Sequence, residues 1–231
     1  KEKSKFNYVN IYNVKSINRP GWISIAGITF YNTNIFLSNC HFKNSYNEDL
    51  MGIINSVFEI NNITFENSFS DSLDIDFSKG LINKVDFYNS SNDSLDISGS
   101  NVSINYLNIY NAGDKAVSVG EDSYVKISNS NIINSNIGLV SKDGSHVSID
   151  NIKFHNNNIV GIASYNKKSE YESASILANN ITFDNNGNNY FLEENNSIIL
   201  NQNSLQKNKS NLKELLYGEK TFWKNWIKNN K

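Results

Sequence analysis

Apolar and polar residues alternate through most of this chain, and the alternation restarts at a nearly fixed interval. A Phe or Ile is followed two positions later by an Asn in seven copies, and consecutive copies lie 23, 22, 22, 23, 22 and 29 residues apart. The anchors are Phe42, Phe65, Phe87, Ile109, Ile132, Phe154 and Phe183, and the asparagines are Asn44, Asn67, Asn89, Asn111, Asn134, Asn156 and Asn185. A repeat of this length indicates stacked supersecondary units.

Other positions of the repeat are apolar as well. The residues seven, five and two positions before each anchor are mostly apolar and often β-branched, which favours half-buried strands. The residues eight positions after the anchors are Leu50, Leu73, Leu95, Val117, Val140, Ile162 and Phe191, and we expect them to point inward. The spacing of three and four that a helical repeat requires is absent from the array.

Strands that recur in one direction pair in parallel with their next copy, and such crossovers are almost always right-handed. The sequence therefore predicts an all-β protein, a right-handed parallel β-helix of about seven regular coils of ~22 residues. We place the β-helix at residues 34–200. The repeated asparagines fit the bends between strands, because Asn tolerates left-handed backbone angles and its amide can pair with the next copy in a ladder.

Both ends of the chain depart from the repeat. Residues 1–33, which include Pro20, are predicted to form an N-terminal cap or irregular coils. Residues 201–231 are predicted to be a C-terminal capping segment with a helix. The apolar positions with helical spacing in this segment are Leu212, Leu215, Leu216, Trp223, Trp226 and Ile227. Binding of a partner or of a membrane surface by this segment is the alternative.

Composition narrows the function classes. A net charge of −2 gives no basic field for nucleic acid. No apolar run reaches the length of a membrane span. A single cysteine, Cys40, excludes an internal disulfide framework, and the three histidines do not cluster as zinc ligands would. Because the chain begins with Lys1 rather than Met, we expect that a leader or an upstream domain has been removed, which leaves secretion open.

Acidic residues recur on the outward side of two successive repeats. The run Asp-Ser-Leu-Asp-Ile at residues 71–75 returns at residues 93–97. Strand alternation sends Asp74 and Asp76 outward, with Asp96 stacked over Asp74 in the next coil. Stacked carboxylates repel each other unless a divalent cation, protonation or nearby lysines compensate. The sequence leaves these three compensators open.

Lysines occupy the following repeats on the same face. Lys115 falls in the column of Asp71 and Asp93, followed by Glu121, and later repeats bring Lys142 with Asp143 and then Tyr165. Extra residues after Tyr165, including Lys167 and Lys168, lengthen the last interval to 29. Insertions in a solenoid are usually loops on the functional face.

Three interpretations of this face compete. The first is a solvated, salt-bridged strip with no chemistry. The second is an enzyme acting on a polysaccharide or oligosaccharide in an outward groove, where Asp74, Asp76 and Asp96 are suitable oxygen ligands for Ca²⁺ and a Lys or Tyr abstracts a proton α to a carboxylate. The third is glycoside hydrolysis by a carboxylate pair.

The coil pattern over roughly residues 30–195 resembles the parallel β-helix superfamily typified by pectate lyases, which includes lyases, hydrolases, epimerases and non-catalytic adhesins. The runs at residues 113–121, 141–143 and 165–171 are similar to a bacterial β-helix group found in larger secreted or surface proteins. This resemblance implies that the chain is part of a larger extracellular or cell-surface bacterial protein. The chain lacks the arginine base and the Asp-Asp/Gly-His-Gly sets of the pectinolytic families. The resemblance therefore implies Lys115 or Lys142 as the base of a lyase or epimerase, with Tyr165 as acid or partner.

The favoured prediction is thus a carbohydrate-active β-helix module with lyase- or epimerase-like proton abstraction. Its predicted catalytic residues are Lys115, Lys142, Tyr165 and Asp96; its substrate-binding residues are Glu121, Asp143, Lys167 and Lys168; its Ca²⁺ ligands are Asp74, Asp76 and Asp96. The alternative is a non-catalytic carbohydrate-binding or structural module that uses the same groove.

Overall fold

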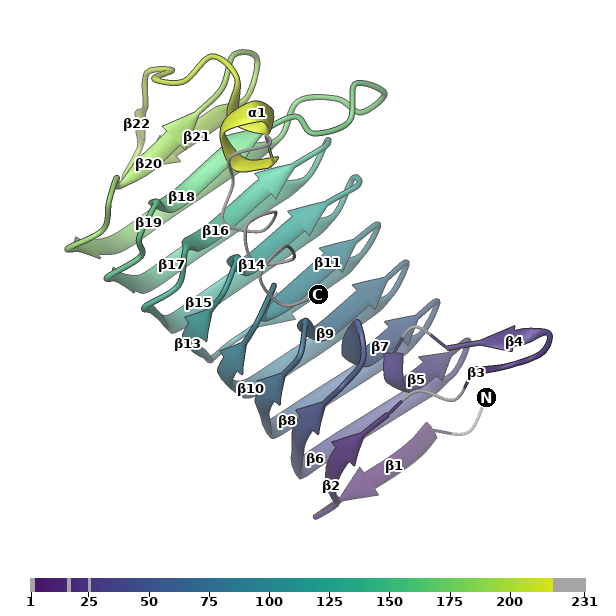
Figure 1. The fold of residues 1–231 in the computed structure, drawn as a ribbon. Helices are drawn as coiled ribbons and strands as arrows, with labels where there is room; N and C mark the ends of the chain where they lie inside the picture. Colours follow the sequence, from purple (N-terminus) through teal and green to yellow (C-terminus); the bar gives the residue numbers. More distant parts are fainter. Residues whose placement is uncertain (1–2, 16–17, 25, 218–231) are drawn as a thin grey trace.

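The computed structural model describes residues 3–15, 18–24 and 26–217 of the 231-residue chain. They form a solenoid in which the chain passes alternately through two long parallel sheets (Figure 1). The larger sheet has twelve strands and the smaller has eight. The predicted parallel β-helix is therefore confirmed, with about eight turns rather than seven.

The strands of the larger sheet are β1 (Lys3–Asn7), β2 (Asn10–Val14), β6 (Asn34–Ser45), β8 (Val57–Ser68), β10 (Lys79–Ser90), β12 (Asn101–Ile104), β13 (Leu107–Ala112), β15 (Tyr124–Ile133), β17 (His146–His155), β19 (Ser175–Asp184), β21 (Ser197–Leu200) and β22 (Asn203–Ser204). Those of the smaller sheet are β5 (Ala26–Tyr31), β7 (Asp49–Ile54), β9 (Asp71–Asp76), β11 (Leu95–Ser98), β14 (Lys115–Gly120), β16 (Ile137–Lys142), β18 (Val160–Tyr165) and β20 (Tyr190–Leu192). A short hairpin, β3 (Asn18–Arg19) and β4 (Trp22–Ile23), and one helix, α1 (Leu212–Tyr217), complete the described elements.

Within the described residues, both ends of the solenoid differ from the repeating coils. Strands β1, β2 and β5 form an additional coil at the N-terminal end, within the segment predicted as cap or irregular coils. At the C-terminal end β22 pairs antiparallel with β21. Helix α1 covers the first part of the predicted helical segment, whereas Trp223, Trp226 and Ile227 lie outside the described residues. No described helix has both the length and the apolar character needed to cross a membrane.

The predicted asparagine bends are confirmed. All seven repeated asparagines have positive φ angles between 54° and 67°. Their amides form ladders between coils: Asn67 donates to Asn44 at 3.1 Å, and Asn89 donates to Asn67 at 3.0 Å. A second bend inside the long strands, which was not predicted, has the same kind of ladder, since Asn62 donates to Asn39 at 2.9 Å.

The core is a column of stacked side chains between the sheets. The rings of Phe42, Phe65 and Phe87 are buried, with centroids 5.4 and 5.1 Å apart along the column. A serine ladder lines the turn after the smaller sheet and was not predicted. Its buried members are Ser56, Ser78, Ser100, Ser123 and Ser145, and each of the first four donates its backbone N–H to the hydroxyl of the next.

The register of one predicted inward column is wrong in three coils. Leu73, Leu95 and Val117 pair with one another as expected. However, Leu73 pairs with Met51 rather than Leu50, and Ile162 pairs with Leu139 and Tyr190 rather than with Val140 and Phe191. The cause is turn length. Lys115 comes four residues after Asn111, whereas Ile137, its partner in register, comes three residues after Asn134.

Candidate functional site

Two acidic columns run along the outward side of the smaller sheet. In the first column Asp49 pairs with Asp71, and the next two coils contribute Asp93 and Lys115. In the second column Gly52 pairs with Asp74, Asp74 with Asp96, and Asp96 with Ser118. The predicted stacking of Asp96 over Asp74, and of Lys115 over Asp93, is therefore confirmed. Asp49 extends the first column by one residue that was not predicted to belong to it.

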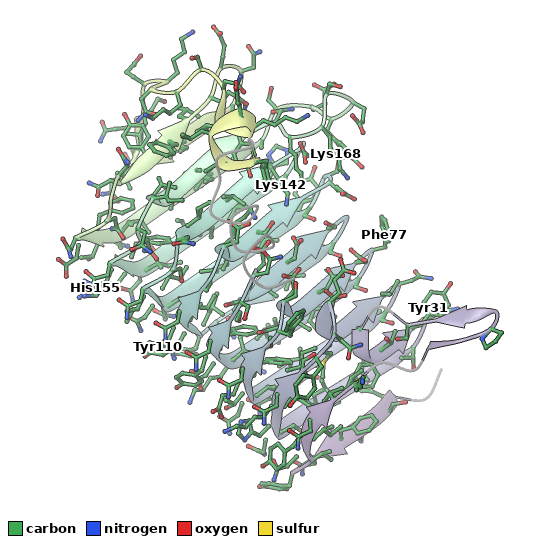
Figure 2. All side chains as sticks on the ribbon, viewed as in Figure 1. Tyr31, Phe77, Tyr110, Lys142, His155 and Lys168 are labelled. Atoms are coloured by element: carbon green, nitrogen blue, oxygen red, sulfur yellow. The ribbon has the colours of Figure 1, made fainter. Side chains whose placement is uncertain are left out.

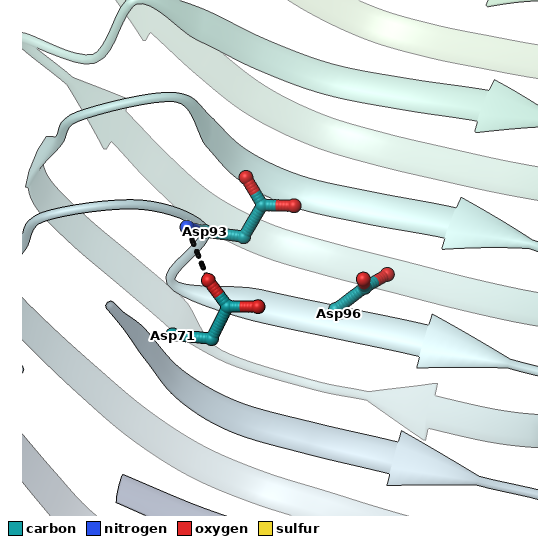
Figure 3. A group of neighbouring side chains, drawn as sticks. All are labelled: Asp71, Asp93 and Asp96. Atoms are coloured by element: carbon teal, nitrogen blue, oxygen red, sulfur yellow. Dashed lines mark hydrogen bonds between the residues drawn. The ribbon is translucent and has the colours of Figure 1, made fainter. Parts of the chain in front are cut away.

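Three of these aspartates converge on one point. Asp71, Asp93 and Asp96 each place a carboxylate oxygen within 4.8 Å of the other two (Figure 3). The column has its own internal hydrogen bonds, because Oδ1 of Asp71 accepts the backbone N–H of Asp93 at 2.9 Å and Oδ1 of Asp93 accepts that of Lys115 at 2.9 Å. These bonds fix the orientation of both carboxylates.

Crowding and burial favour the neutral form of several of these carboxyls. Burial, and then the neighbouring Asp76 carboxylate, raises the pKa of Asp74 to about 9. Burial, and then Glu48, raises the pKa of Asp49 to about 7. The pKa of Asp71 is also raised, first by burial and then by Asp93. Protonation is thus one of the three compensators that the stacked column requires, and it acts mainly on Asp49, Asp71 and Asp74.

Lysines are the second compensator. The buried ammonium of Lys115 lies 3.3 Å from Asp93 Oδ1 and also pairs with Asp114. The ammonium group of Lys142 donates to Ser118 Oγ at 2.6 Å and lies 4.0 Å from Asp96 Oδ1. Although burial disfavours the charged form, the surrounding carboxylates raise the pKa of both lysines. Both therefore carry fixed positive charge.

Helix α1 covers the next coils of the same face (Figure 1). The outward column that begins with Asp74 and Asp96 continues as Val140, Ala163 and Phe191, and Leu212 and Leu216 of α1 pack on this apolar part. Asn211 caps the helix: its Oδ1 accepts the N–H of Glu214 at 3.1 Å, and its amide donates to the Glu214 carboxylate at 2.7 Å.

The last residue of α1, Tyr217, closes the site. Its hydroxyl lies 2.7 Å from that of Tyr165, and the ammonium groups of Lys115 and Lys167 lie 5.3 and 4.6 Å from its ring centre. Tyr165 is buried beneath it, and burial followed by the neighbouring Tyr217 raises its pKa. The predicted acid Tyr165 is therefore covered by Tyr217, and its hydroxyl is buried against the hydroxyl of that residue.

The insertion after Tyr165 folds back over the preceding turn. Oδ1 of the buried Asp143 accepts the backbone N–H groups of Lys167 and Lys168, both at 2.7 Å, and the Lys168 ammonium pairs with Glu121. Figure 2 shows Lys168 on this loop and Lys142 beside α1. Glu121, Asp143 and Lys168, which were predicted to bind substrate, thus hold the loop in place, and the loop carries Lys167 to the site.

A second anchor joins the loop to the helix. One carboxylate oxygen of Glu193 accepts the N–H of Asn166 at 3.1 Å, and the other accepts that of Leu212 at 3.0 Å. Glu193 therefore fixes the start of the insertion and the start of α1 relative to each other. No motif in the sequence marks Glu193, because its two partners lie 27 and 19 residues away along the chain.

Together these elements enclose a pocket of about 260 Å³. It is lined by Asp71, Asn92, Asp93, Asp96, Asp114, Lys115, Lys142, Lys167, Leu216 and Tyr217. Four predicted site residues, Asp96, Lys115, Lys142 and Lys167, thus meet in it. Asp74 and Asp76 lie on the neighbouring stretch of the acidic face and are not part of its lining. Asp71 and Asp93 were recognisable from the repeated Asp-Ser-Leu-Asp motif.

Lys167 differs from the other two lysines of the pocket. Burial, and then the positive charges of Lys142 and Lys115, lowers its pKa. The pocket therefore contains two ammonium groups held charged by carboxylates and one amine displaced toward the neutral form. This is the arrangement that lets a lysine accept a proton.

A divalent cation is the third compensator that the sequence leaves open. Asp71, Asp93 and Asp96 offer only oxygen donors close together, which suits a hard cation such as Ca²⁺. The predicted ligand set Asp74, Asp76 and Asp96 shares Asp96 with this group. Lysine ammonium groups already lie beside Asp93 and Asp96, so charge balance at these two residues does not require a metal ion.

The stacked parallel coils and the pocket on an outward sheet face define a β-helix protein with a built polar site. The family model described as "Right handed beta helix region" matches residues 53–170, which is just over half of the chain. The chain belongs to this right-handed β-helix family. Its fold fits the pectate-lyase-like superfamily that the coil pattern resembles. Neither a curated protein nor a solved structure was found to match it.

Proposed function

We propose that the chain is a carbohydrate-active β-helix module that seats one acidic sugar unit of a polysaccharide in the pocket and moves the proton α to its carboxylate. One observation carries the proposal: the pocket holds a carboxyl whose pKa is raised, Asp71, together with an amine whose pKa is lowered, Lys167. Opposite displacements of this kind suit one group to donate a proton and the other to accept one.

Each residue then has a role that its surroundings support. Lys167 accepts the proton from the carbon α to the carboxylate. Lys115 and Lys142, which stay charged, stabilise the negative charge that develops on the carboxylate. Asp71 donates a proton. In elimination the C–H electron pair forms a double bond while the adjacent C–O bond breaks, and the leaving oxygen takes the proton of Asp71. In epimerisation the carbon takes a proton back on its opposite face.

In this proposal the role of the predicted Ca²⁺ is limited to binding the substrate carboxylate. Asp71, Asp93 and Asp96 would hold the ion, and when bound it would add positive charge for the substrate carboxylate. Proton acceptance by Lys167 does not depend on the ion, whereas an ion bound to Asp71 would compete with the proton that Asp71 donates. Activity in the presence of a chelator measures its contribution.

A binding module without catalysis is the second candidate, and one observation favours it. Tyr217 lies against Lys115 and Lys167, so the base of the proposed reaction is covered by a side chain of the same protein. A pocket closed in this way suits recognition of a chain end or side group better than turnover of a long polymer.

The deciding experiment compares two adjacent lysines. Polygalacturonate and alginate are incubated with the protein and with K167M and K168M, and both unsaturated chain ends and deuterium uptake from heavy water are followed. We expect K167M to lose at least 100-fold in rate, the scale of a general base. K168M removes only the exposed ion pair with Glu121, while Asp143 still accepts the backbone N–H groups of residues 167 and 168, so this variant keeps most of the rate. Binding of either polymer without ends or deuterium uptake would leave only the binding module.

A further inference from the structure

A second hollow on the solenoid is lined by asparagines and carries no charge. It has a volume of about 590 Å³ and lies where the larger sheet turns toward the smaller one, after strands β15, β17 and β19. Its lining is Asn134, Asn156, Asn157, Asn158, Asn185, Asn186 and Gly187. We call it the amide groove. None of these residues lines the charged pocket.

The amides are held rigidly by one another. Along one side Asn185 donates to Asn156 at 2.6 Å, and Asn156 donates to Asn134 at 3.2 Å. At the bottom of the groove the side-chain oxygen Oδ1 of Asn186 accepts both the backbone N–H and the side-chain N–H of Asn157, at 3.0 and 2.8 Å. A ligand therefore meets side chains whose orientation is already fixed, which lowers the entropic cost of binding.

The ladder leaves hydrogen-bonding capacity unused. An Asn side chain has two N–H donors and two acceptor lone pairs, and a ladder contact on each side uses one of each. Asn156, which has a ladder contact on each side, thus keeps one donor and one acceptor, and successive rungs are one strand spacing, about 4.8 Å, apart. On the other side Asn158, which is exposed, donates to Asn136 at 2.8 Å and offers the same pair of groups.

The ligand class follows from this lining. The groove presents no ionised group and no apolar side chain, so neither an ion nor a hydrophobic segment gains from entering it. Hydroxyl groups both donate and accept, and a row of them matches a row of amides. From this geometry we infer that the amide groove binds a neutral oligosaccharide stretch, and that it does so whether or not the charged pocket is catalytic.

The test uses the side-chain amide signals themselves. The ¹⁵N-labelled chain is titrated with cellohexaose, maltohexaose and the N-acetylglucosamine hexamer, and the Nδ2–H₂ resonances are followed by NMR. We expect at least one sugar to shift the signals of Asn156, Asn158 and Asn185. Signals of ladder asparagines away from the groove, such as Asn67 and Asn89, stay in place. If no hexasaccharide moves the groove signals, the inference is overturned.

A matched pair of variants separates binding from ladder stability. Asn156 and Asn89 occupy the same column, have φ angles of 55° and 59°, and each donates to the preceding asparagine. N156D and N89D therefore disturb the ladder alike, but only N156D removes donors from the groove. We expect N156D to weaken sugar binding roughly fivefold or more, and N89D to leave it unchanged. Equal weakening by both would overturn the assignment. Retention of binding by K167M would show that it is independent of the proposed reaction.

Discussion

The side chain of Lys142 lies across the backbone of Gly120, one coil earlier. A Cβ added to Gly120 would meet the Cε of Lys142 at 2.8 Å and its Cγ at 3.3 Å. In this position the Lys142 ammonium group donates a hydrogen bond to Ser118 and lies 4.0 Å from Oδ1 of Asp96. Gly120 is therefore a positioning residue. Because it has no side chain, it leaves the space in which the Lys142 side chain lies on its way to the pocket.

Replacing Gly120 by alanine should expel Lys142 from this channel. The φ angle of Gly120 is not positive, so alanine fits the backbone and the clash with the lysine is the main cost, roughly 1–3 kcal/mol. Amine-labelling followed by mass spectrometry measures the outcome, and Lys142 should react faster in G120A than in the parent protein. G52A is the control, because its Cβ would meet only the Cβ of Ala26 at 3.2 Å. Unchanged labelling of Lys142 in G120A would contradict the prediction.

Asp143 should determine whether the inserted loop stays closed. In D143A the backbone N–H groups of Lys167 and Lys168 lose their acceptor, which costs about 1–3 kcal/mol for a buried donor. Hydrogen exchange over residues 166–174 should then accelerate, while exchange in the core strands β8 and β10 stays slow. D143N retains one carbonyl oxygen and should lie between the parent and D143A. Slow loop exchange in D143A would show that Glu121 and Glu193 suffice.

The acidic columns predict that stability falls as pH rises. The pKa of Asp74 is about 9 in the folded protein, against 3.8 for the ordinary group. The folded state therefore holds a proton that the unfolded chain has released, and stability present at low pH is lost between about pH 4 and pH 9. Asp49, with a pKa of about 7 in the folded protein, adds a further loss of stability that is complete at a lower pH than that of Asp74.

The D74N variant isolates this effect. An amide cannot ionise, so D74N should match the parent in urea denaturation at pH 4 and exceed it at pH 9, where one pKa unit corresponds to about 1.4 kcal/mol. The exposed Asp184 is the control. Its hydrogen bond from Lys153 lowers its pKa, so D184N should bring no gain at pH 9. Equal stability of D74N and parent at pH 9 would mean that Asp74 ionises freely.

Leu212 should hold α1 on the sheet. It is buried in the cluster formed with Val140 and Ala163, and truncating such a leucine costs about 2–5 kcal/mol, enough to detach a six-residue helix. Spectrophotometric titration reports the release, because Tyr165 loses its cover and its raised pKa returns toward the ordinary value. L215A is the matched control on the same helix, since Leu215 is exposed. A tyrosine titration curve that is the same in L212A as in the parent would contradict this role.

The repeat made most of the fold predictable. The interval between asparagines sets the register of the coils, and it placed Asp96 over Asp74 and Lys115 over Asp93 correctly. It failed for Val140 because a turn shorter by one residue shifts every later position, and nothing in the residue types reveals such a shift. Val140 is apolar and buried, as predicted, but its partners are α1 residues rather than the core.

The site was less predictable, because two of its walls come from outside the repeat. Tyr217 and Lys167 reach the pocket through a helix and an insertion whose paths depend on contacts such as Glu193 with Leu212 and Asp143 with Lys168. Alternation along a strand shows which side chains face outward. It gives no information on which outward face another segment will cover, so Tyr165 was predicted to be accessible and is buried.

Asp93 and Lys115 occupy the same place in consecutive coils, and this has a consequence for how such a site arises. The pocket needs no loop of special shape on its floor, because its opposite charges are substitutions at one position of a unit copied along the chain. Duplicating or deleting a whole coil would lengthen or shorten the charged column by one strand spacing while the bends, ladders and core remained intact. In this architecture a new functional group can be introduced by substituting one residue in one copy of the repeat. The distance between two charged groups then depends on the number of coils that separate them.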